Sequence, residues 1–225
     1  MTVSSPTSEL ASPFSETACR QISEAAWGRQ ALDSFFALLG LIVLSPFLAA
    51  IALATVCDSG WPVFFEQTRI GRGGKPFRLL KFRTMRTGLT GPSITARGDS
   101  RITRVGRVLR KFKLDEIPQL WNVVRGEMSL VGPRPEVPEF VEMETAIWRC
   151  VLKVRPGITD PASIAYRNEE EILAKAADRI RYYREELLPA KLALNVEYLK
   201  RRSFWQDCKV ILSTAKCALF PGTSN

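Results

Sequence analysis

Histidine is absent from this sequence of 225 residues. Its absence excludes a histidine general base, a Ser-His-Asp triad and histidine metal ligands. Any acid–base or nucleophilic chemistry must therefore fall to Asp, Glu, Lys, Tyr, Ser or Cys.

Cysteine is scarce, and its spacing is irregular. The five cysteines are odd in number, and none forms a Cys-x-x-Cys pair. This pattern argues against a zinc site and against a disulfide framework. We therefore expect free thiols in a reducing compartment. The positions are Cys19, Cys57, Cys150, Cys208 and Cys217.

Acidic residues are in deficit. The chain has 23 Asp and Glu against 32 Lys and Arg, which gives a net charge of +9. A basic chain predicts an anionic partner, which is nucleic acid, an anionic membrane surface or a phosphorylated substrate. The hydrophobic fraction of 46% is enough for a core, and the length allows one large or two small domains.

One long apolar run interrupts this polar chain. Residues 34–57 contain no charge, and as a helix they would extend about 36 Å, enough for a hydrocarbon core of about 30 Å. Ser45-Pro46 lies at the centre, and proline disrupts a helix. The residues alone leave two arrangements open, a kinked spanning helix and a re-entrant helix-break-helix. The basic segment after Asp58 is expected on the cytoplasmic side. Residues 1–28 read as a mobile tail without a signal peptide.

The remainder predicts an α+β, mostly helical domain. Residues 63–65 and 77–82 flank a Gly-rich turn and indicate a β-hairpin. A polar loop over residues 87–99 is a candidate cover for the site, and residues 101–113 predict a basic amphipathic helix. We expect further amphipathic helices over residues 169–188, 190–202 and 203–219.

The strongest candidates for catalytic residues are Asp115 and Glu116, which directly follow the predicted basic helix. Two carboxylates beside this much positive charge suit a phosphorylated anion, held by cations and attacked or metal-bridged by a carboxylate. A structural interpretation also stands, in which Asp115 caps the helix that Pro118 begins. Downstream, two prolines make Gly132-Pro133-Arg134-Pro135 a rigid turn that presents Arg134.

The ordered motifs resemble those of the bacterial sugar transferases, in the small monotopic form of the polyprenyl-phosphate phosphoglycosyl transferases. The likeness covers roughly residues 29–219. Besides the apolar run with its central Ser45-Pro46, it rests on residues 67–71 (QTRIG), 81–85 (KFRTM), 114–120 (LDEIPQL), 128–135 (MSLVGPRP), 155–159 (RPGIT) and 203–205 (SFW).

The resemblance implies an enzyme that moves a sugar-1-phosphate from a UDP-sugar to undecaprenyl phosphate, releases UMP and uses Mg²⁺. Asp115 would be the nucleophile that forms a covalent phospho-sugar intermediate, and Glu116 would support it as a base or as a second metal ligand. The membrane product would pass to downstream glycosyltransferases of surface polysaccharide assembly. The resemblance also implies a re-entrant segment at residues 29–58 in the bacterial inner membrane, a cytoplasmic catalytic domain at 59–220 and a short tail at 221–225.

Four cations are candidate ligands for the substrate phosphates. Arg110 and Arg134 can each make planar two-pronged contacts, and Lys81 and Arg83 end the hairpin strand near the same space. The sequence departs from the common family pattern after Thr159, where Asp160 begins a stretch without the usual Gly-x-Ala-Gln. The sugar is therefore not predicted.

Two other functions are compatible with the composition. A membrane-anchored nucleic-acid binder would explain the charge, but the chain has no RNP, KH or zinc-finger pattern and no aromatics interleaved with its basic run. A non-catalytic scaffold that kept the fold would not need the intact carboxylate pair and its cations. We therefore expect an enzyme without a nucleic-acid partner.

Overall fold

The computed structural model describes Cys19, Ile22 and residues 27–88 and 99–219. This part of the chain is mostly helical with two small two-stranded sheets, in agreement with the predicted α+β class. The candidate cover at residues 87–99 lies largely outside it. The α-helices and β-strands are α2 (Trp27–Ser59), β1 (Phe64–Ile70), β2 (Pro76–Phe82), α3 (Arg104–Lys111), α4 (Gln119–Val124), β3 (Ser129–Val131), α5 (Ala146–Val151), β4 (Gly157–Thr159), α6 (Pro161–Ala165), α7 (Glu169–Lys175), α8 (Arg179–Tyr182), α9 (Leu188–Lys200) and α10 (Phe204–Leu219) within the described residues.

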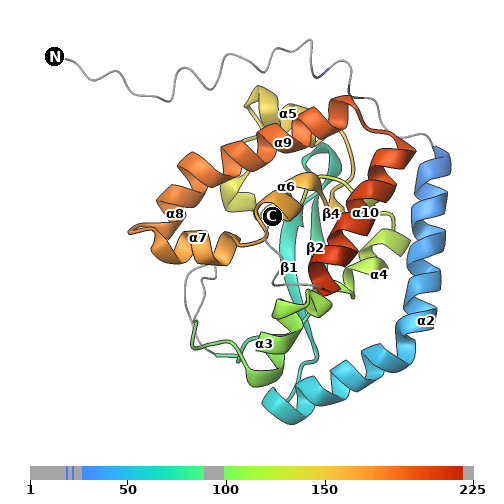
Figure 1. Cartoon of the computed structure of the whole chain (residues 1–225), viewed down its shortest axis with the longest axis vertical. Coiled ribbons are helices and arrows are strands. Elements are labelled where there is room, and N and C mark those ends of the chain that lie inside the picture. Colours follow the sequence, from blue (N-terminus) through green and yellow to red (C-terminus); the bar gives the residue numbers. More distant parts are fainter. Residues whose placement is uncertain (1–18, 20–21, 23–26, 89–98, 220–225) are drawn as a thin grey trace.

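Helix α2 contains the apolar run and bends within it. Pro46 lies inside the helix, and the Ser45 hydroxyl donates to the Ile42 carbonyl at 2.8 Å. Figure 1 shows two arms that meet at a marked angle, as expected where proline removes a backbone donor and clashes with the preceding turn. The predicted break is therefore present as a bend in one continuous helix.

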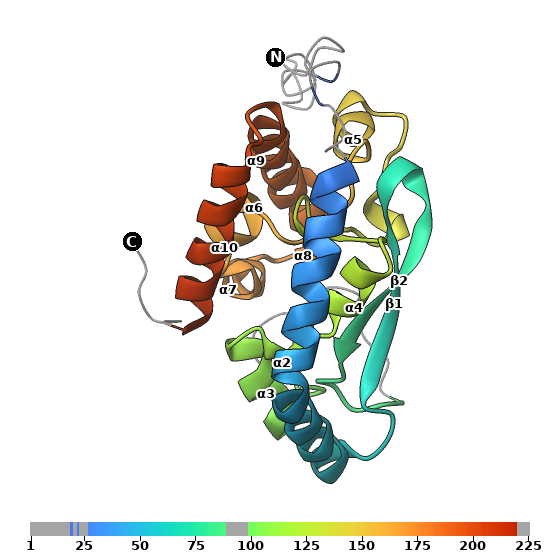
Figure 2. The ribbon, with the colours of Figure 1, turned by 90° about the vertical axis from the view of Figure 1, so that its right-hand side faces the viewer.

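Both arms of α2 pack against the same domain. In the first arm, Ala37 is fully buried beside α4, and Arg29 pairs with Asp207 of α10 at 3.7 Å. In the second arm, Ile51 packs against Leu109 of α3, and the two views place α3 beside this arm (Figures 1 and 2). The helix thus follows the domain along its length instead of projecting from it.

The other side of α2 is apolar and exposed. Residues 28–59 are long and apolar enough to cross a membrane, and only 11% of the most apolar window is buried. A soluble monomer rarely exposes so large an apolar surface, and this face is compatible with membrane association. The exposed side chains include Leu32, Phe35, Phe36, Leu38, Leu39, Ile42, Val43, Phe47 and Leu53.

The predicted hairpin is confirmed with longer strands. Strands β1 and β2 are antiparallel, with Phe64 opposite Phe82 and Ile70 opposite Pro76. Gly73 and Gly74 at its tip have positive φ angles of 67° and 75°, which glycine adopts at little cost. Strands β3 and β4 form a separate parallel pair.

The helical predictions are partly corrected. Helix α3 begins at Arg104, because Thr103 accepts the Gly106 amide and acts as N-cap, so residues 101–103 are not helical. The helix predicted over 169–188 is interrupted, because α7 ends at Lys175 and Asp178 caps the start of α8. A π-helical turn over Tyr183–Leu187 then joins α8 to α9, so no break separates residues 188 and 190.

The cysteine expectation was wrong for one pair. Cys19 and Cys150 form a disulfide with Cα atoms 5.0 Å apart, whereas Cys57, Cys208 and Cys217 are free. The two partners are 131 residues apart, a proximity that sequence spacing does not reveal. Cys19 and Ile22 are also buried in the main core, which places two residues of the predicted tail against the domain.

Candidate active site

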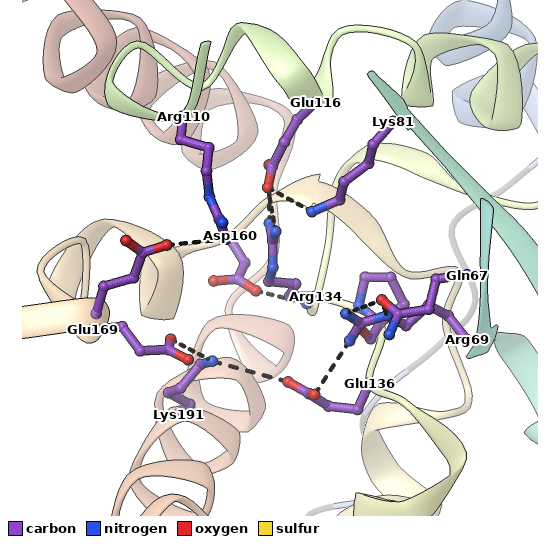
Figure 3. A network of polar contacts seen from close by, with 12 residues as sticks. Gln67, Arg69, Lys81, Arg110, Glu116, Arg134, Glu136, Asp160, Glu169 and Lys191 are labelled. Atoms are coloured by element: carbon purple, nitrogen blue, oxygen red, sulfur yellow. Dashed lines mark hydrogen bonds and ion pairs between the residues drawn. The ribbon is translucent and has the colours of Figure 1, made fainter. Parts of the chain in front are cut away.

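Glu116 is held by two cations from distant parts of the chain. Arg134 donates from Nη1 to Oε2 at 3.1 Å and from Nη2 to Oε1, and Lys81 Nζ donates to Oε1 at 3.0 Å. Lys81 comes from β2 and Arg134 from the turn after β3, and both side chains meet at Glu116 (Figure 3). The structure thus brings three of the predicted site residues together.

Asp115 is buried beside this cluster but differs in its contacts. Residues 114–116 form a single 3₁₀ turn, which follows Lys113 in the left-handed conformation at φ 57°. Helix α4 has Pro118 as N-cap and no side-chain cap, so Asp115 does not have the structural capping role. Its Oδ1 atom is buried without a hydrogen-bond partner among the described residues. An unpaired buried carboxylate oxygen is costly, and such groups mark functional sites.

The two carboxyl groups have opposite pKa shifts. Burial raises the pKa of Asp115, and the adjacent negative charge of Glu116 raises it further. Burial also opposes ionisation of Glu116, but Arg134, Lys81 and Lys113 outweigh it and hold the pKa of Glu116 well below its usual range. Glu116 therefore stays ionised as a fixed anion, while Asp115 carries its charge at a cost.

Arg134 lies on a turn that two close strands support. The Gly132 amide donates to the Thr159 carbonyl, and the Gly157 amide donates to the Pro133 carbonyl, each at 3.0 Å. A Cβ atom on Gly157 would lie 2.1 Å from the Gly132 nitrogen, and one on Gly132 would lie 2.7 Å from the Arg155 carbonyl oxygen. Both positions therefore require glycine.

The remaining predicted phosphate ligands have different positions. Arg110 pairs with Glu170 at 3.2 Å, its Nη1 atom is buried without a partner among the described residues, and its charge lowers the pKa of Asp115. Arg83 is directed away from the cluster. Its guanidinium donates to the Trp61 and Ser59 carbonyls at 2.8 and 2.9 Å, so it binds the end of α2 instead.

A second buried network lies next to the Arg134 turn, and most of its residues were not predicted from the sequence. Glu136 accepts from the Tyr183 hydroxyl at 2.6 Å and lies 3.5 Å from Arg69 and 3.9 Å from Lys191 (Figure 3). Burial and Glu136 raise the pKa of Tyr183, so its phenol remains a donor. The available signal was Lys191, a charge on an apolar helical face that must be paired when buried.

The residues present suit a magnesium ion only if the substrate completes its shell. Among the described residues, no group of three or more His, Cys, Asp or Glu could hold a metal. Mg²⁺ is commonly bound by one or two carboxylates together with substrate phosphates and water. The unpaired Asp115 oxygen, with Glu116 adjacent, fits that mode.

Comparison with known proteins identifies the family. The model of the family described as bacterial sugar transferase matches residues 24–221. The chain therefore belongs to the bacterial sugar transferase family, as its motifs predicted, and it is a phosphoglycosyl transferase.

Its relatives carry names that specify different sugars. The chain is 37% identical over 197 residues to a UDP-glucose:undecaprenyl-phosphate glucose-1-phosphate transferase of Caulobacter vibrioides, covering 85% of this chain and 69% of the relative. It is 36% identical to an undecaprenyl-phosphate glucose phosphotransferase of Komagataeibacter xylinus, covering 92% of this chain and 39% of the relative. It is 34% identical to a UDP-N-acetylgalactosamine-undecaprenyl-phosphate N-acetylgalactosaminephosphotransferase of Aeromonas hydrophila, covering 86% and 44%. The chain thus spans less than half the length of the last two.

Proposed function

We propose that this enzyme transfers a sugar-1-phosphate from a UDP-sugar to undecaprenyl phosphate, in two displacements at Asp115. The observation that carries the proposal is the contrast within the carboxylate pair. Glu116 is fixed by two cations, while Asp115 keeps a buried oxygen with no hydrogen-bond partner in the described part of the chain. The names of the relatives support the two substrate classes. Because the names of the relatives specify different sugars, the sugar that this enzyme transfers has to be measured.

In the first displacement, an Asp115 oxygen attacks the phosphorus next to the sugar. The new P–O bond forms as the phosphoanhydride bond breaks, and the electron pair leaves with UMP. In the second, a phosphate oxygen of undecaprenyl phosphate attacks the same phosphorus and Asp115 leaves as carboxylate. Because the intermediate is covalent, the two phosphorylated substrates never share one transition state.

The charges around Asp115 suit this chemistry. Lys81, Arg110 and Arg134 offset the phosphate charge, and Arg110 retains a buried Nη1 donor for a phosphate oxygen. Asp115 and Glu116 are the carboxylates that would hold Mg²⁺ together with the substrate phosphates. When bound, the ion would neutralise part of the diphosphate charge.

We further propose that α2 is re-entrant, with both ends on the cytoplasmic face of the inner membrane. The bend at Pro46 supports this arrangement. So do the contacts of both arms with one domain, because Arg29 near the start reaches α10 and Asp58 near the end accepts the Val105 amide in the first turn of α3. A spanning helix would separate one of these ends from the domain by the thickness of the bilayer.

The decisive experiment measures UMP release by nanodisc-held protein with undecaprenyl phosphate, Mg²⁺ and a panel of UDP-sugars. We expect release that requires the lipid phosphate and the metal, with one sugar preferred. Radiolabelled sugar should remain on the wild-type protein after denaturation when the lipid is omitted, and Asp115→Asn should carry none. Label retained by Asp115→Asn would refute the nucleophile assignment, and no release with any sugar would refute the proposed reaction.

A further inference from the structure

The backbone of the Arg134 turn has only two N–H groups, because Pro133 and Pro135 have none. One belongs to Gly132 and donates to a backbone carbonyl in β4. The other belongs to Arg134 and donates to Oδ2 of Asp160 at 2.6 Å. A side chain, not the sheet, thus fixes the residue that presents the guanidinium to Glu116.

Asp160 connects three elements, β4, α6 and α9. It follows β4 directly, its Oδ1 accepts the Ser163 amide at the start of α6, and its Oδ2 also accepts from Asn195 Nδ2 of α9 at 3.3 Å. Its side chain is fully buried, with no exposed surface. A buried carboxylate bonded to N–H groups on both oxygens is a rigid acceptor, and its position is over-determined by its partners.

We propose that Asp160 is a positioning residue for Arg134. It fixes the backbone at Arg134, so that both prongs of the guanidinium reach the two oxygens of Glu116 (Figure 3). The proposal rests on the proposed function in one respect only, because turnover serves as one of its two readouts.

The carboxylate matters because both of its oxygens receive N–H donors. In Asp160→Asn, one oxygen becomes an NH₂ group, so a donor would face the amide of either Arg134 or Ser163. The turn must then shift or leave a buried group unpaired. A displacement of about 1 Å in a site that requires oriented charges can cost about a hundredfold in rate.

The first test is a double-mutant cycle on kcat/KM for UMP release. We expect Asp160→Asn to lose about tenfold to a hundredfold, and Arg134→Ala to lose at least as much. The double variant should be no slower than Arg134→Ala, because without the guanidinium there is nothing left to position. Multiplied losses would show that Asp160 acts independently of Arg134 and would overturn the proposal.

A matched control separates positioning from capping. Asp178 accepts the Arg181 amide at 3.0 Å and caps α8, but it lies in a different, exposed N-cap. Asp178→Asn should leave kcat/KM unchanged and change the thermal midpoint little, because Asn caps a helix about as well as Asp. If Asp160→Asn does not fold, Asn195→Ala removes one donor to the same carboxylate and should give a smaller loss that is also masked by Arg134→Ala.

The second test needs no turnover, so it still judges the proposal if the proposed reaction is wrong. Urea unfolding of the Arg134→Met and Glu116→Gln variants gives the coupling free energy of that ion pair. We expect this coupling to fall in the Asp160→Asn background and to persist in Asp178→Asn. Equal coupling in both backgrounds would show that Asp160 does not position Arg134.

Discussion

Asp115 and Glu116 are neighbours in sequence, yet their surroundings differ in kind. Glu116 contacts Lys81 and Arg134, which lower its pKa, whereas burial raises the pKa of Asp115, and its Oδ1 has no hydrogen-bond partner within residues 27–88 and 99–219. One 3₁₀ turn thus places Glu116 between two cations and leaves Oδ1 of Asp115 without a hydrogen-bond partner among the described residues. Under the proposed mechanism, the difference teaches that charge fixation and nucleophilic attack can be assigned to adjacent residues.

The largest expected effect is the loss of turnover in Asp115→Asn. Removal of a covalent nucleophile should lower kcat by more than about a thousandfold. The measurement is UMP release at saturating UDP-sugar and lipid phosphate, with Asp178→Asn as control. A comparable loss in the control would point to misfolding instead.

Glu116→Gln should damage the fold as well as the activity. The substitution leaves Lys81 and Arg134 without their anion in a buried site, and breaking such a pair costs roughly 3 kcal/mol. The free energy of unfolding in urea provides the check. Because the pKa of Glu116 is lowered in the fold, its contribution is present above the unfolded value of about 4.3 and is lost as pH falls through the folded value. The difference in unfolding free energy between Glu116→Gln and wild type should therefore decrease as the pH is lowered.

Asp115→Asn should have the opposite effect on stability. A raised pKa in the fold means that ionised Asp115 destabilises the native state, an effect that appears as pH rises above the unfolded value of about 3.9. The variant should be more stable than wild type by roughly 1 kcal/mol at neutral pH, with no difference in strong acid. The measurement is unfolding across pH in metal-free buffer. A variant that is less stable at neutral pH would contradict the unpaired state of Asp115.

The smallest effect on substrate affinity is expected at Arg83. Because its guanidinium binds carbonyls at the end of α2, Arg83→Lys should lower stability by about 1 kcal/mol and leave KM for the UDP-sugar unchanged. Arg134→Lys should show the contrasting pattern, with a kinetic defect of about a hundredfold. A raised KM for the UDP-sugar in Arg83→Lys would indicate instead that Arg83 binds the substrate phosphates.

Local signals in the sequence predicted the elements whose causes are local. Ser45-Pro46 marked the bend, and the Gly-rich turn between two apolar stretches marked the hairpin. Contacts over long separations were not predictable. The pairing of Cys19 with Cys150 and the acceptor role of Asp160 depend on how distant segments pack.

Within the site, sequence indicated the residue types but not their division of work. Residues two positions apart on a strand point to the same face, so the motif grouped Lys81 with Arg83, but β2 ends at Phe82 and Arg83 lies beyond it. Lys81 donates to Glu116, whereas Arg83 donates to a backbone carbonyl at the end of α2. Tyr183 and Lys191 were missed because their partner, Glu136, is far away in sequence.

The close approach of Gly132 and Gly157 also limits how this protein can evolve. No side chain fits at either position, since any Cβ would collide with backbone that cannot yield. Point substitutions at Gly132 or Gly157 therefore cannot adjust the geometry of the Arg134 turn without disrupting it. New substrate preferences must be acquired by changing side chains that surround the turn, which makes its periphery the place for variation.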